Sequence, residues 1–210
     1  MLPYGYEKQR DNVLSPGTFS LERHRLMWLY LKNETSFFTE KAKVLHIAPE
    51  QSFIKRFRAM KNLEYITSDI ESPLADVKAD ICDLPFGDDT FDIIFCNHVL
   101  EHIPDDHKAM SELFRVMKPG GWGILQVPIS YQRDVTYEDP TVTTKEERKE
   151  KFWQYDHVRV YGLDYYRRLE DVGFIVEKVD YTKQIPSEDV QKYCLEKGEI
   201  LPVVRKPKTE

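Results

Sequence analysis

The chain has 210 residues, and its 30 Lys and Arg residues against 36 Asp and Glu residues give a formal net charge of −6. This balance argues against a nucleic-acid partner held by bulk positive charge. With 41% hydrophobic and 31% charged residues, the composition is that of a globular domain with a substantial buried core. Glycine is scarce: nine of the 210 residues are glycine, which is about 4% where a share of about 7% is usual. None lies between Gly17 and Gly87.

Targeting signals and cysteine motifs are missing from the sequence. No stretch approaches the roughly 20 apolar residues that a membrane-spanning helix needs, and the first residues lack a basic segment followed by an apolar run. We therefore expect no membrane insertion and a cytoplasmic location. Cys82, Cys96 and Cys194 are scattered without C-x-x-C spacing, which indicates neither a disulfide framework nor a cysteine-based zinc site. No metal site is predicted.

The first half of the chain alternates between strand and helix patterns. Residues 1–19 are rich in polar and turn-forming types, and Ser20 is expected to cap a helix whose apolar face includes Met27 and Leu31. A helix is expected over residues 53–60. Strands are expected at 43–48, 63–68, 77–82 and 91–96. The last of these is a nearly continuous apolar run, as in a strand that helices cover on both faces.

The second half continues the alternation, with one interruption. Pro104 suits the first turn of a helix that residues 118–121 are expected to stop, and a strand over 123–128 follows. Residues 130–159 carry a charge run at 145–151 and few aliphatic side chains, which suits either a lid or a solvated excursion. A helix from Leu163 to a cap at Gly173 and strands at 174–181 and 200–205 complete the chain. The alternation predicts a parallel sheet covered by helices on both faces.

Four short motifs follow one another between Asp80 and Gly121. They are Asp80 followed by Leu84-Pro85-Phe86, then Phe91-Asp92-Ile93-Ile94, then His98, then Glu112-Leu113-Phe114-Arg115-Val116-Met117-Lys118-Pro119-Gly120-Gly121. In this order and spacing the motifs resemble the class I S-adenosylmethionine-dependent methyltransferases, in particular those similar to methyltransferase type 11. The resemblance covers residues 42–130 well and the last helix and strand pair more loosely.

The resemblance implies an α/β fold: a doubly wound, mostly parallel seven-stranded sheet with helices on both faces. It also implies a division of the chain. Residues 1–41 would form an N-terminal segment and helix that cover the acceptor site. Residues 42–210 would form the methyltransferase-like domain, with a lid insertion at about 130–160.

The same resemblance implies a cofactor site at the carboxyl ends of the strands, where ligands of doubly wound sheets bind. Asp69, next to Ile70, would hold the ribose hydroxyls, and Asp80 with the Ile81 backbone would hold the adenine. Asn97 and His98 would border the methionine part. An Asp at a strand end can instead be a turn or helix cap, and Asp83 can replace Asp80 as the carboxylate.

The loop after the first strand of this domain departs from the family pattern. The family places an acidic residue and a G-x-G-x-G turn there, so that bare backbone approaches the cofactor. Here His46 stands where the acid would be, and Ala48, Glu50 and Ser52 stand where the glycines would be. Either Glu50 supplies the carboxylate for the cofactor's ammonium group and the small residues permit close approach, or the cofactor site has decayed.

Candidates for the acceptor side are polar residues of the lid and of the N-terminal helix. His98, Tyr131 and His157 are candidate catalytic residues, and His157 next to acids suits a base near neutral pH. The candidate substrate ligands are Arg23, Arg25, Asp156, Arg159 and Tyr161. The alternatives are that residues 156–162 merely tie the lid to the following helix, and that Arg23 and Arg25 lie on a solvated helix face.

The preceding turn resembles a subset of bacterial methyltransferase-like proteins that carry C-P-x-C before S-L-E-R-H-R. Here Ser15 and Thr18 replace both cysteines, so any metal role of those cysteines is not expected in this chain.

These observations predict transfer of a methyl group from S-adenosylmethionine to a small molecule, with S-adenosylhomocysteine as the product. The alternative is a non-catalytic binding or interaction module that retains the fold. A nicotinamide-dependent oxidoreductase is disfavoured because no G-x-G-x-x-G follows the first strand. The sequence identifies neither the acceptor nor the oligomeric state.

Overall fold

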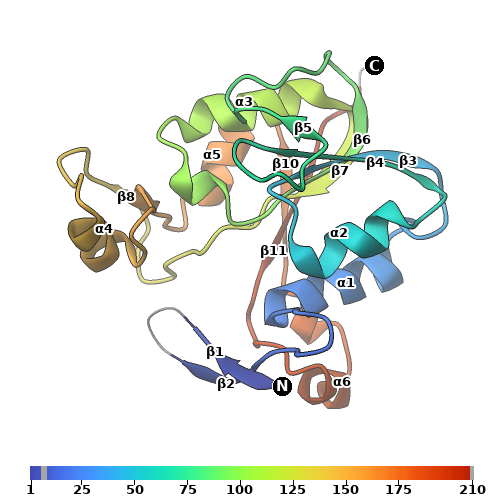
Figure 1. Ribbon diagram of the computed structural model, residues 1–210, viewed down its shortest axis with the longest axis horizontal. Helices are drawn as coiled ribbons and strands as arrows, with labels where there is room; N and C mark the ends of the chain where they lie inside the picture. The colour runs from blue at the N-terminus through green and yellow to red at the C-terminus, as the bar shows by residue number, and fades with distance from the viewer. Residues whose placement is uncertain (6–8, 209–210) are drawn as a thin grey trace. The chain divides into compact units, whose positions relative to one another are not determined.

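The computed structural model describes residues 1–5 and 9–208 of the chain (Figure 1). They divide into two compact units. The first unit comprises Met1–Ala42, Pro49–Tyr65 and Lys178–Leu201, and the second comprises Lys43–Ala48, Ile66–Glu177 and Pro202–Glu210. The first unit thus contains residues well beyond 1–41. The expected domain boundary at residue 42, and the covering role of the N-terminal part, stay predictions.

A seven-stranded sheet has the strand order β10-β11-β7-β6-β3-β4-β5. Its strands are β3 (Ala42–Ile47), β4 (Leu63–Asp69), β5 (Val77–Lys78), β6 (Phe91–Cys96), β7 (Met117–Ile124), β10 (Ile175–Val179) and β11 (Leu201–Arg205). The pairs β3–β6, β6–β7 and β4–β5 are parallel, whereas β11 is antiparallel to β7. The expected fold class, a mostly parallel seven-stranded sheet with helices, is confirmed.

The core of the second unit lies along the central strands. Val44, Leu45, Ile94 and Phe95 are fully buried on β3 and β6, because helices and neighbouring strands exclude water from strands of this kind. The helices of this unit are α3 (Asp106–Val116), α4 (Lys145–Phe152) and α5 (Tyr165–Asp171), with the short 3₁₀ helix η1 at Leu100–His102.

Helix α3 begins with a side-chain cap and ends directly at a strand. The Asp105 side chain accepts a hydrogen bond from the Lys108 N–H, which satisfies a donor at the helix start. The expectation that residues 118–121 form a turn before a strand at 123–128 is wrong, because β7 already begins at Met117. A Cβ atom at Gly121 would lie 3.0 Å from the Asp92 carbonyl oxygen. The glycines therefore let β7 pass close to the backbone of β6.

The segment 130–160 contains regular structure that the sequence analysis did not predict. Its charge run forms α4, which begins at a capping box in which Thr144 and Glu147 bond each other's backbone N–H groups. The short strands β8 (Tyr137–Glu138) and β9 (Arg159–Val160) pair antiparallel. The segment is thus folded into a helix and a hairpin-like pair rather than a bare loop.

The first unit contains two further departures from the expectations. Residues 1–14 include an antiparallel pair, β1 (Leu2–Tyr4) and β2 (Arg10–Leu14), which polar composition did not signal. Its helices are α1 (Glu22–Glu34), α2 (Gln51–Arg58) and α6 (Ser187–Lys192), with η2 at Tyr181–Lys183. Leu21, not Ser20, precedes α1, because His24 Nδ1 accepts the Leu21 N–H at 3.0 Å and so takes over the capping.

Aromatic rings form much of the core of the first unit. The Phe57 ring on α2 stacks on Phe53, with ring centroids 5.1 Å apart, and on Trp28 of α1, at 6.1 Å. Its edge also meets Phe37. These contacts join α1, α2 and the chain between them into one apolar cluster.

Candidate functional site

The second unit contains a cavity at the carboxyl ends of its strands. Its lining comes from the ends of β3, β4 and β5 and from the residues around η1: Ile47, Ala48, Ser68, Asp69, Ile70, Ala79, Asp80, Ile81, Val99 and Ile103. This edge of a doubly wound sheet is where such folds bind ligands. Five of the expected cofactor residues, Ala48, Asp69, Ile70, Asp80 and Ile81, line it together.

Asp69 lies at the end of β4 with its carboxylate held in a fixed position. Its Oδ1 accepts the N–H groups of Glu71 and Ser72, each at 2.8 Å. The residue is therefore a turn cap, as one alternative held, and it lines the cavity as well. Both of these hydrogen bonds end on Oδ1, and neither ends on the second carboxylate oxygen, Oδ2. Ile70, next to it, is half exposed at the cavity.

Asp80 and Asp83 differ in their relation to the cavity. Asp80 lines it, and Asp80 Oδ1 accepts the Cys82 N–H at 2.8 Å, which fixes the loop. Asp83 is exposed and is not part of the lining. Ile81 is buried between them. The structure thus brings Asp80, rather than Asp83, to the place where a cavity ligand would contact a carboxylate.

The glycine-poor loop takes a backbone conformation that glycine usually adopts. Ala48 has φ of +45°, in the left-handed region that costs an ordinary residue about 1–2 kcal/mol. Its N–H donates to the Ser68 carbonyl at 2.8 Å, which ties the loop to β4. The methyl side chain is small, so backbone of this strained turn still borders the cavity.

His46 and Glu50 do not line this cavity. The His46 side chain is fully buried on β3, with its ring edge against Phe95 at 5.6 Å. Glu50 lies at the start of α2 in the first unit, where its Oε1 is 3.7 Å from His24 Nε2. His46 is thus not among the residues that line the cavity with Asp69 and Asp80, and the role of Glu50, which belongs to the first unit, stays a prediction.

Asn97 and His98 follow β6 but are not in the cavity lining. Asn97 is buried, and its Oδ1 accepts the Gln126 N–H. The His98 N–H donates to the Gln126 carbonyl at 2.7 Å, and His98 has φ of +54°. These bonds hold the end of β6 against the chain after β7 in a strained turn, which functional sites often contain.

His98 is also part of a group of buried and half-buried ionisable side chains, which we call the Glu101 cluster: His98, Glu101, His102 and His157. Glu101 is 1% exposed, and its Oε1 lies 3.3 Å from His98 Nδ1. Within the described part of the chain, neither Glu101 oxygen has a hydrogen-bond partner of ordinary geometry, and the buried Nε2 of His98 has none. Burial by itself would raise the pKa of Glu101, but the His98 and His102 imidazoles outweigh it and lower that pKa.

His157 reaches the Glu101 cluster from the segment 130–160. It is buried, its ring lies edge-on to His102 at 4.7 Å, and its Nδ1 is 2.9 Å from the Phe152 carbonyl. Burial lowers its pKa below the usual value. Asp156 pairs with His102 at 3.5 Å and accepts from Gln154. Tyr131, in contrast, is 57% exposed.

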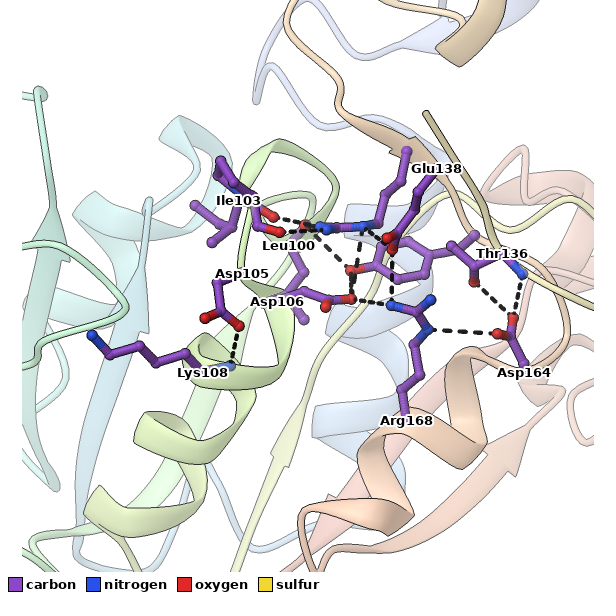
Figure 2. Close-up of polar contacts among 12 residues, drawn as sticks. Leu100, Ile103, Asp105, Asp106, Lys108, Thr136, Glu138, Asp164 and Arg168 are labelled. Atoms are coloured by element: carbon purple, nitrogen blue, oxygen red, sulfur yellow. Dashed lines mark hydrogen bonds and ion pairs between the residues drawn. The ribbon is translucent and has the colours of Figure 1, made fainter. Parts of the chain in front are cut away.

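Arg159, an expected substrate ligand, is engaged by protein groups. The guanidinium is buried and donates to the carbonyls of Leu100, Ile103 and Pro104 and to the Glu138 carboxylate. Figure 2 shows three of these partners, Leu100, Ile103 and Glu138, close to one another. These contacts favour the alternative that this run ties the segment 130–160 to the rest of the unit. The role of Arg159 as a substrate ligand stays a prediction.

Tyr161, another expected substrate ligand, is also engaged inside the protein, and its role toward a substrate stays a prediction. It is fully buried, and its hydroxyl donates to Asp106 Oδ2 at 2.8 Å. Burial raises the pKa of Tyr161 well above its usual value. Arg168 donates to the same Asp106 oxygen at 3.0 Å and to Glu138 at 2.9 Å (Figure 2). We call this group, Asp106, Glu138, Arg159, Tyr161 and Arg168, the Arg159 cluster.

Arg25 of the first unit, also an expected substrate ligand, is likewise engaged by protein groups, and its role toward a substrate stays a prediction. Its guanidinium makes four hydrogen bonds to backbone carbonyls, those of Val13, Ser20, Tyr193 and Cys194. Burial lowers the pKa of Arg25. Arg23 is different, since its buried Nε has no hydrogen-bond partner among the described residues. Its proposed role as a substrate ligand stays a prediction.

The first unit has a cavity of its own, which the sequence analysis missed. Its lining comes from the turn before α1, from α1 and α2, and from Tyr193: Ser15, Thr18, Ser20, His24, Arg25, Trp28, Leu29, Ser52, Phe53, Arg56 and Tyr193. Ser15 and Thr18, which replace the two cysteines of the similar proteins, both lie in it. No local sequence signal marks such a cavity, because its walls come from three separate stretches of chain.

Residues 31–125 match the methyltransferase domain family. Over these residues the chain is similar to methyltransferase domains. Among curated relatives, 122 residues are 33% identical to an uncharacterized methyltransferase of Schizosaccharomyces pombe, over 56% of this chain and 40% of the relative. In a second comparison, a stretch of 45 residues is 49% identical to a ubiquinone/menaquinone biosynthesis C-methyltransferase of Vibrio vulnificus, over 21% of this chain and 17% of that protein. The matches thus span well under half of these relatives.

Solved structures share the fold at low sequence identity. A protein from Listeria monocytogenes, described as an S-adenosylmethionine-dependent methyltransferase, superposes with a TM-score of 0.56 at 15% identity, over 89% of this chain and 99% of that one. The [4+2]-cyclase SpnF superposes with a TM-score of 0.62 at 14% identity, over 94% of this chain and 87% of that one. At such identities these likenesses show the fold alone. Of the helices in the described chain, none is both long and apolar enough to cross a membrane.

Proposed function

We propose that this chain transfers the methyl group of S-adenosylmethionine to a small molecule in the cytoplasm. The cavity of the second unit carries this proposal, because it combines two strand-end carboxylates, Asp69 and Asp80, with apolar walls from Ile81 and Val99. A nucleoside needs both: acceptors for its hydroxyl and amino groups, and apolar surface against its base. The net charge of −6 supports a small-molecule acceptor rather than a nucleic acid.

The residues of the cavity fit the cofactor by the chemistry of their donor and acceptor atoms. Asp69 has Oδ1 occupied by the turn and offers Oδ2 to ribose hydroxyls. Asp80 would accept from the adenine amino group, beside Ile81. The left-handed turn at Ala48 presents backbone at the cavity, where the family has glycine. The bound cofactor supplies an electrophilic methyl group on a sulfonium.

The remaining requirement of such a transfer is positioning, and a base where the acceptor must lose a proton. His98 is the strongest candidate base among the three expected catalytic residues. Its Nδ1 faces the Glu101 carboxylate at 3.3 Å, and its buried Nε2 lacks a hydrogen-bond partner within the described chain. A carboxylate on one imidazole nitrogen orients the ring and fixes which nitrogen carries the proton. Its neighbour Val99 lines the cavity.

A non-catalytic module is the competing proposal, and one observation favours it. Glu50 belongs to the first unit and its carboxylate pairs with His24 there, and a carboxylate that is already paired is less suited to meet the cofactor's ammonium group. If the chain is such a module, it keeps the fold but does not bind S-adenosylmethionine.

Isothermal titration calorimetry with S-adenosylhomocysteine separates the two proposals. We expect saturable binding by the wild-type protein. Asp69→Asn keeps an oxygen for the Glu71 and Ser72 N–H groups but loses the charge. We expect about 10- to 150-fold weaker binding, because a hydrogen bond to a charged group contributes about 1.5–3 kcal/mol. Asp83→Asn, at an exposed carboxylate outside the lining, is the matched control.

Two results would contradict the proposal. The first is the absence of any heat of binding when folded wild-type protein is titrated with millimolar S-adenosylhomocysteine, which would show that the protein does not bind this cofactor. Equal affinities of Asp69→Asn and the wild type would show that the donor binds elsewhere.

A further inference from the structure

The Glu101 cluster contains a buried carboxylate whose charged neighbours are imidazoles. Glu101 is 1% exposed, its Oε1 lies 3.3 Å from His98 Nδ1, and neither of its oxygens has a hydrogen bond of ordinary geometry within the described chain. A buried ionised carboxylate with so few hydrogen bonds can accept a further partner. Buried carboxylates usually have a partner of opposite charge or a metal ion.

Two imidazoles face the same point as this carboxylate. One ligand atom each from Glu101, His102 and His157 lie within 4.8 Å of one another. Ligands at about 2.0–2.1 Å from a tetrahedral zinc ion lie about 3.4 Å apart, so the three groups need to close by little more than 1 Å. Both histidines and the carboxylate therefore stand within reach of a single ion.

The outer nitrogens of both imidazoles are already engaged by the protein. His157 Nδ1 is 2.9 Å from the Phe152 carbonyl, and His102 Nδ1 lies 3.3 Å from the Asp156 carbonyl and 3.5 Å from its carboxylate. A carbonyl or carboxylate oxygen can only accept, so each Nδ1 carries the proton. Each Nε2 is then a lone-pair donor. Metal-binding histidines are commonly oriented by such contacts.

A backbone hydrogen bond joins the two segments of chain that carry the cluster. The Val158 N–H donates to the Glu101 carbonyl at 2.9 Å, so His157 and Glu101 are neighbours across two segments. His98, 3.3 Å from Glu101 Oε1, is placed to support the carboxylate from outside. The geometry does not depend on a flexible side chain finding its partner.

We propose that Glu101, His102 and His157 bind a divalent first-row transition-metal ion such as zinc. Two imidazoles and one carboxylate select such an ion over magnesium or calcium, which prefer all-oxygen ligands. Three protein ligands leave a fourth position open. The ion joins residues 152–158 to the turn at 100–102, whose neighbours Val99 and Ile103 line the cavity. The site stands on its own ligands and does not rest on the proposed methyl transfer.

Cobalt absorption spectroscopy and zinc competition test this site. Protein stripped with chelator is titrated with Co²⁺, and zinc affinity is measured against a chromophoric chelator. We expect one Co²⁺ per chain with ligand-field absorption in the visible, displaced by zinc. We expect zinc to bind at least tenfold more weakly to His157→Ala and to the isosteric variant Glu101→Gln. His107→Ala, at an exposed histidine on α3, is the matched control and should bind as the wild type.

The outcomes separate the site from misfolding and from the methyltransferase proposal. Circular dichroism of the stripped Glu101→Gln protein checks that the variant folds, so that a loss of metal is a loss of a ligand. Absence of ligand-field absorption in the wild type would overturn the proposal. So would equal zinc affinity in the wild type and both site variants. Saturable binding of S-adenosylhomocysteine by wild-type protein that shows no ligand-field absorption with Co²⁺ would leave the methyltransferase proposal standing while this one fails.

Discussion

The Arg159 cluster and the Glu101 cluster lie in the same unit and join the same two stretches of chain. They differ in how completely their charged groups are hydrogen-bonded. Arg159 donates to three carbonyls and a carboxylate, and Asp106 accepts from both Tyr161 and Arg168. Glu101, equally buried, has no hydrogen-bond partner of ordinary geometry within the described chain. Buried charges that the protein satisfies hold the fold together. A buried carboxylate such as Glu101, which has an imidazole 3.3 Å away but no hydrogen bond of ordinary geometry within the described chain, can accept a further ligand.

The largest expected effect is the loss of Arg159. Arg159→Leu should lower the free energy of unfolding by about 3–5 kcal/mol, because it removes one partner from a buried charge network and leaves Asp106 short of one. Arg167→Leu, at a side chain that is 78% exposed and pairs with Asp171, should change it by less than about 1 kcal/mol. Urea denaturation of both variants measures the difference. Similar losses in the two variants would show that the Arg159 cluster is no more structural than the surface.

A smaller effect is expected from Tyr161, with a pH dependence of defined sign. Tyr161→Phe removes the 2.8 Å hydrogen bond to Asp106 and should cost about 1–2 kcal/mol near pH 7. Because burial raises the pKa of Tyr161 well above 10, the unfolded chain loses this proton first as pH rises. Wild-type stability therefore falls above about pH 10, by up to about 1.4 kcal/mol per pH unit for this group.

Tyr161→Phe lacks this ionisable group, so its stability should fall less steeply than that of the wild type above pH 10. Denaturant titrations at a series of alkaline pH values measure the two slopes. Parallel slopes would mean that Tyr161 titrates in the folded protein as it does in the unfolded chain.

The smallest effect is expected from Glu101 in metal-free protein. Glu101→Gln should change the free energy of unfolding by less than about 1 kcal/mol, because the cost of burying the carboxylate and its attraction to the His98 and His102 imidazoles oppose each other. Urea denaturation in the presence of chelator measures it. A loss as large as that of Arg159→Leu would place Glu101 among the structural charges and remove the contrast between the clusters.

Local pattern was enough to predict the sheet and one side of the site. The apolar run of β6 and the strand-end positions of Asp69 and Asp80 can each be recognised in a short continuous stretch of sequence. The structure brings both carboxylates to one cavity. Sequence could also locate the unusual first loop, although not that Ala48 takes the left-handed conformation.

The roles of Arg25 and Arg159 could not be predicted, because their partners are backbone carbonyls. A carbonyl has no residue type, and those around Arg25 come from residues as far apart as Val13 and Cys194. The Glu101 cluster was missed for a related reason. His157 reaches Glu101 and His102 only after the segment 130–160 has folded into α4 and β9, and no spacing motif spans such a distance.

Thermal unfolding with chelator and then with zinc tests most directly the claim that the Glu101 cluster is a ligand site. At free zinc about 100 times its dissociation constant, one bound ion adds about 2.7 kcal/mol to the folded state, which is a rise in Tm of about 5–10 °C for a chain of this size. We predict this rise for the wild type and its loss in Glu101→Gln. A wild-type Tm that zinc leaves unchanged, or an equal rise in Glu101→Gln, would contradict the account.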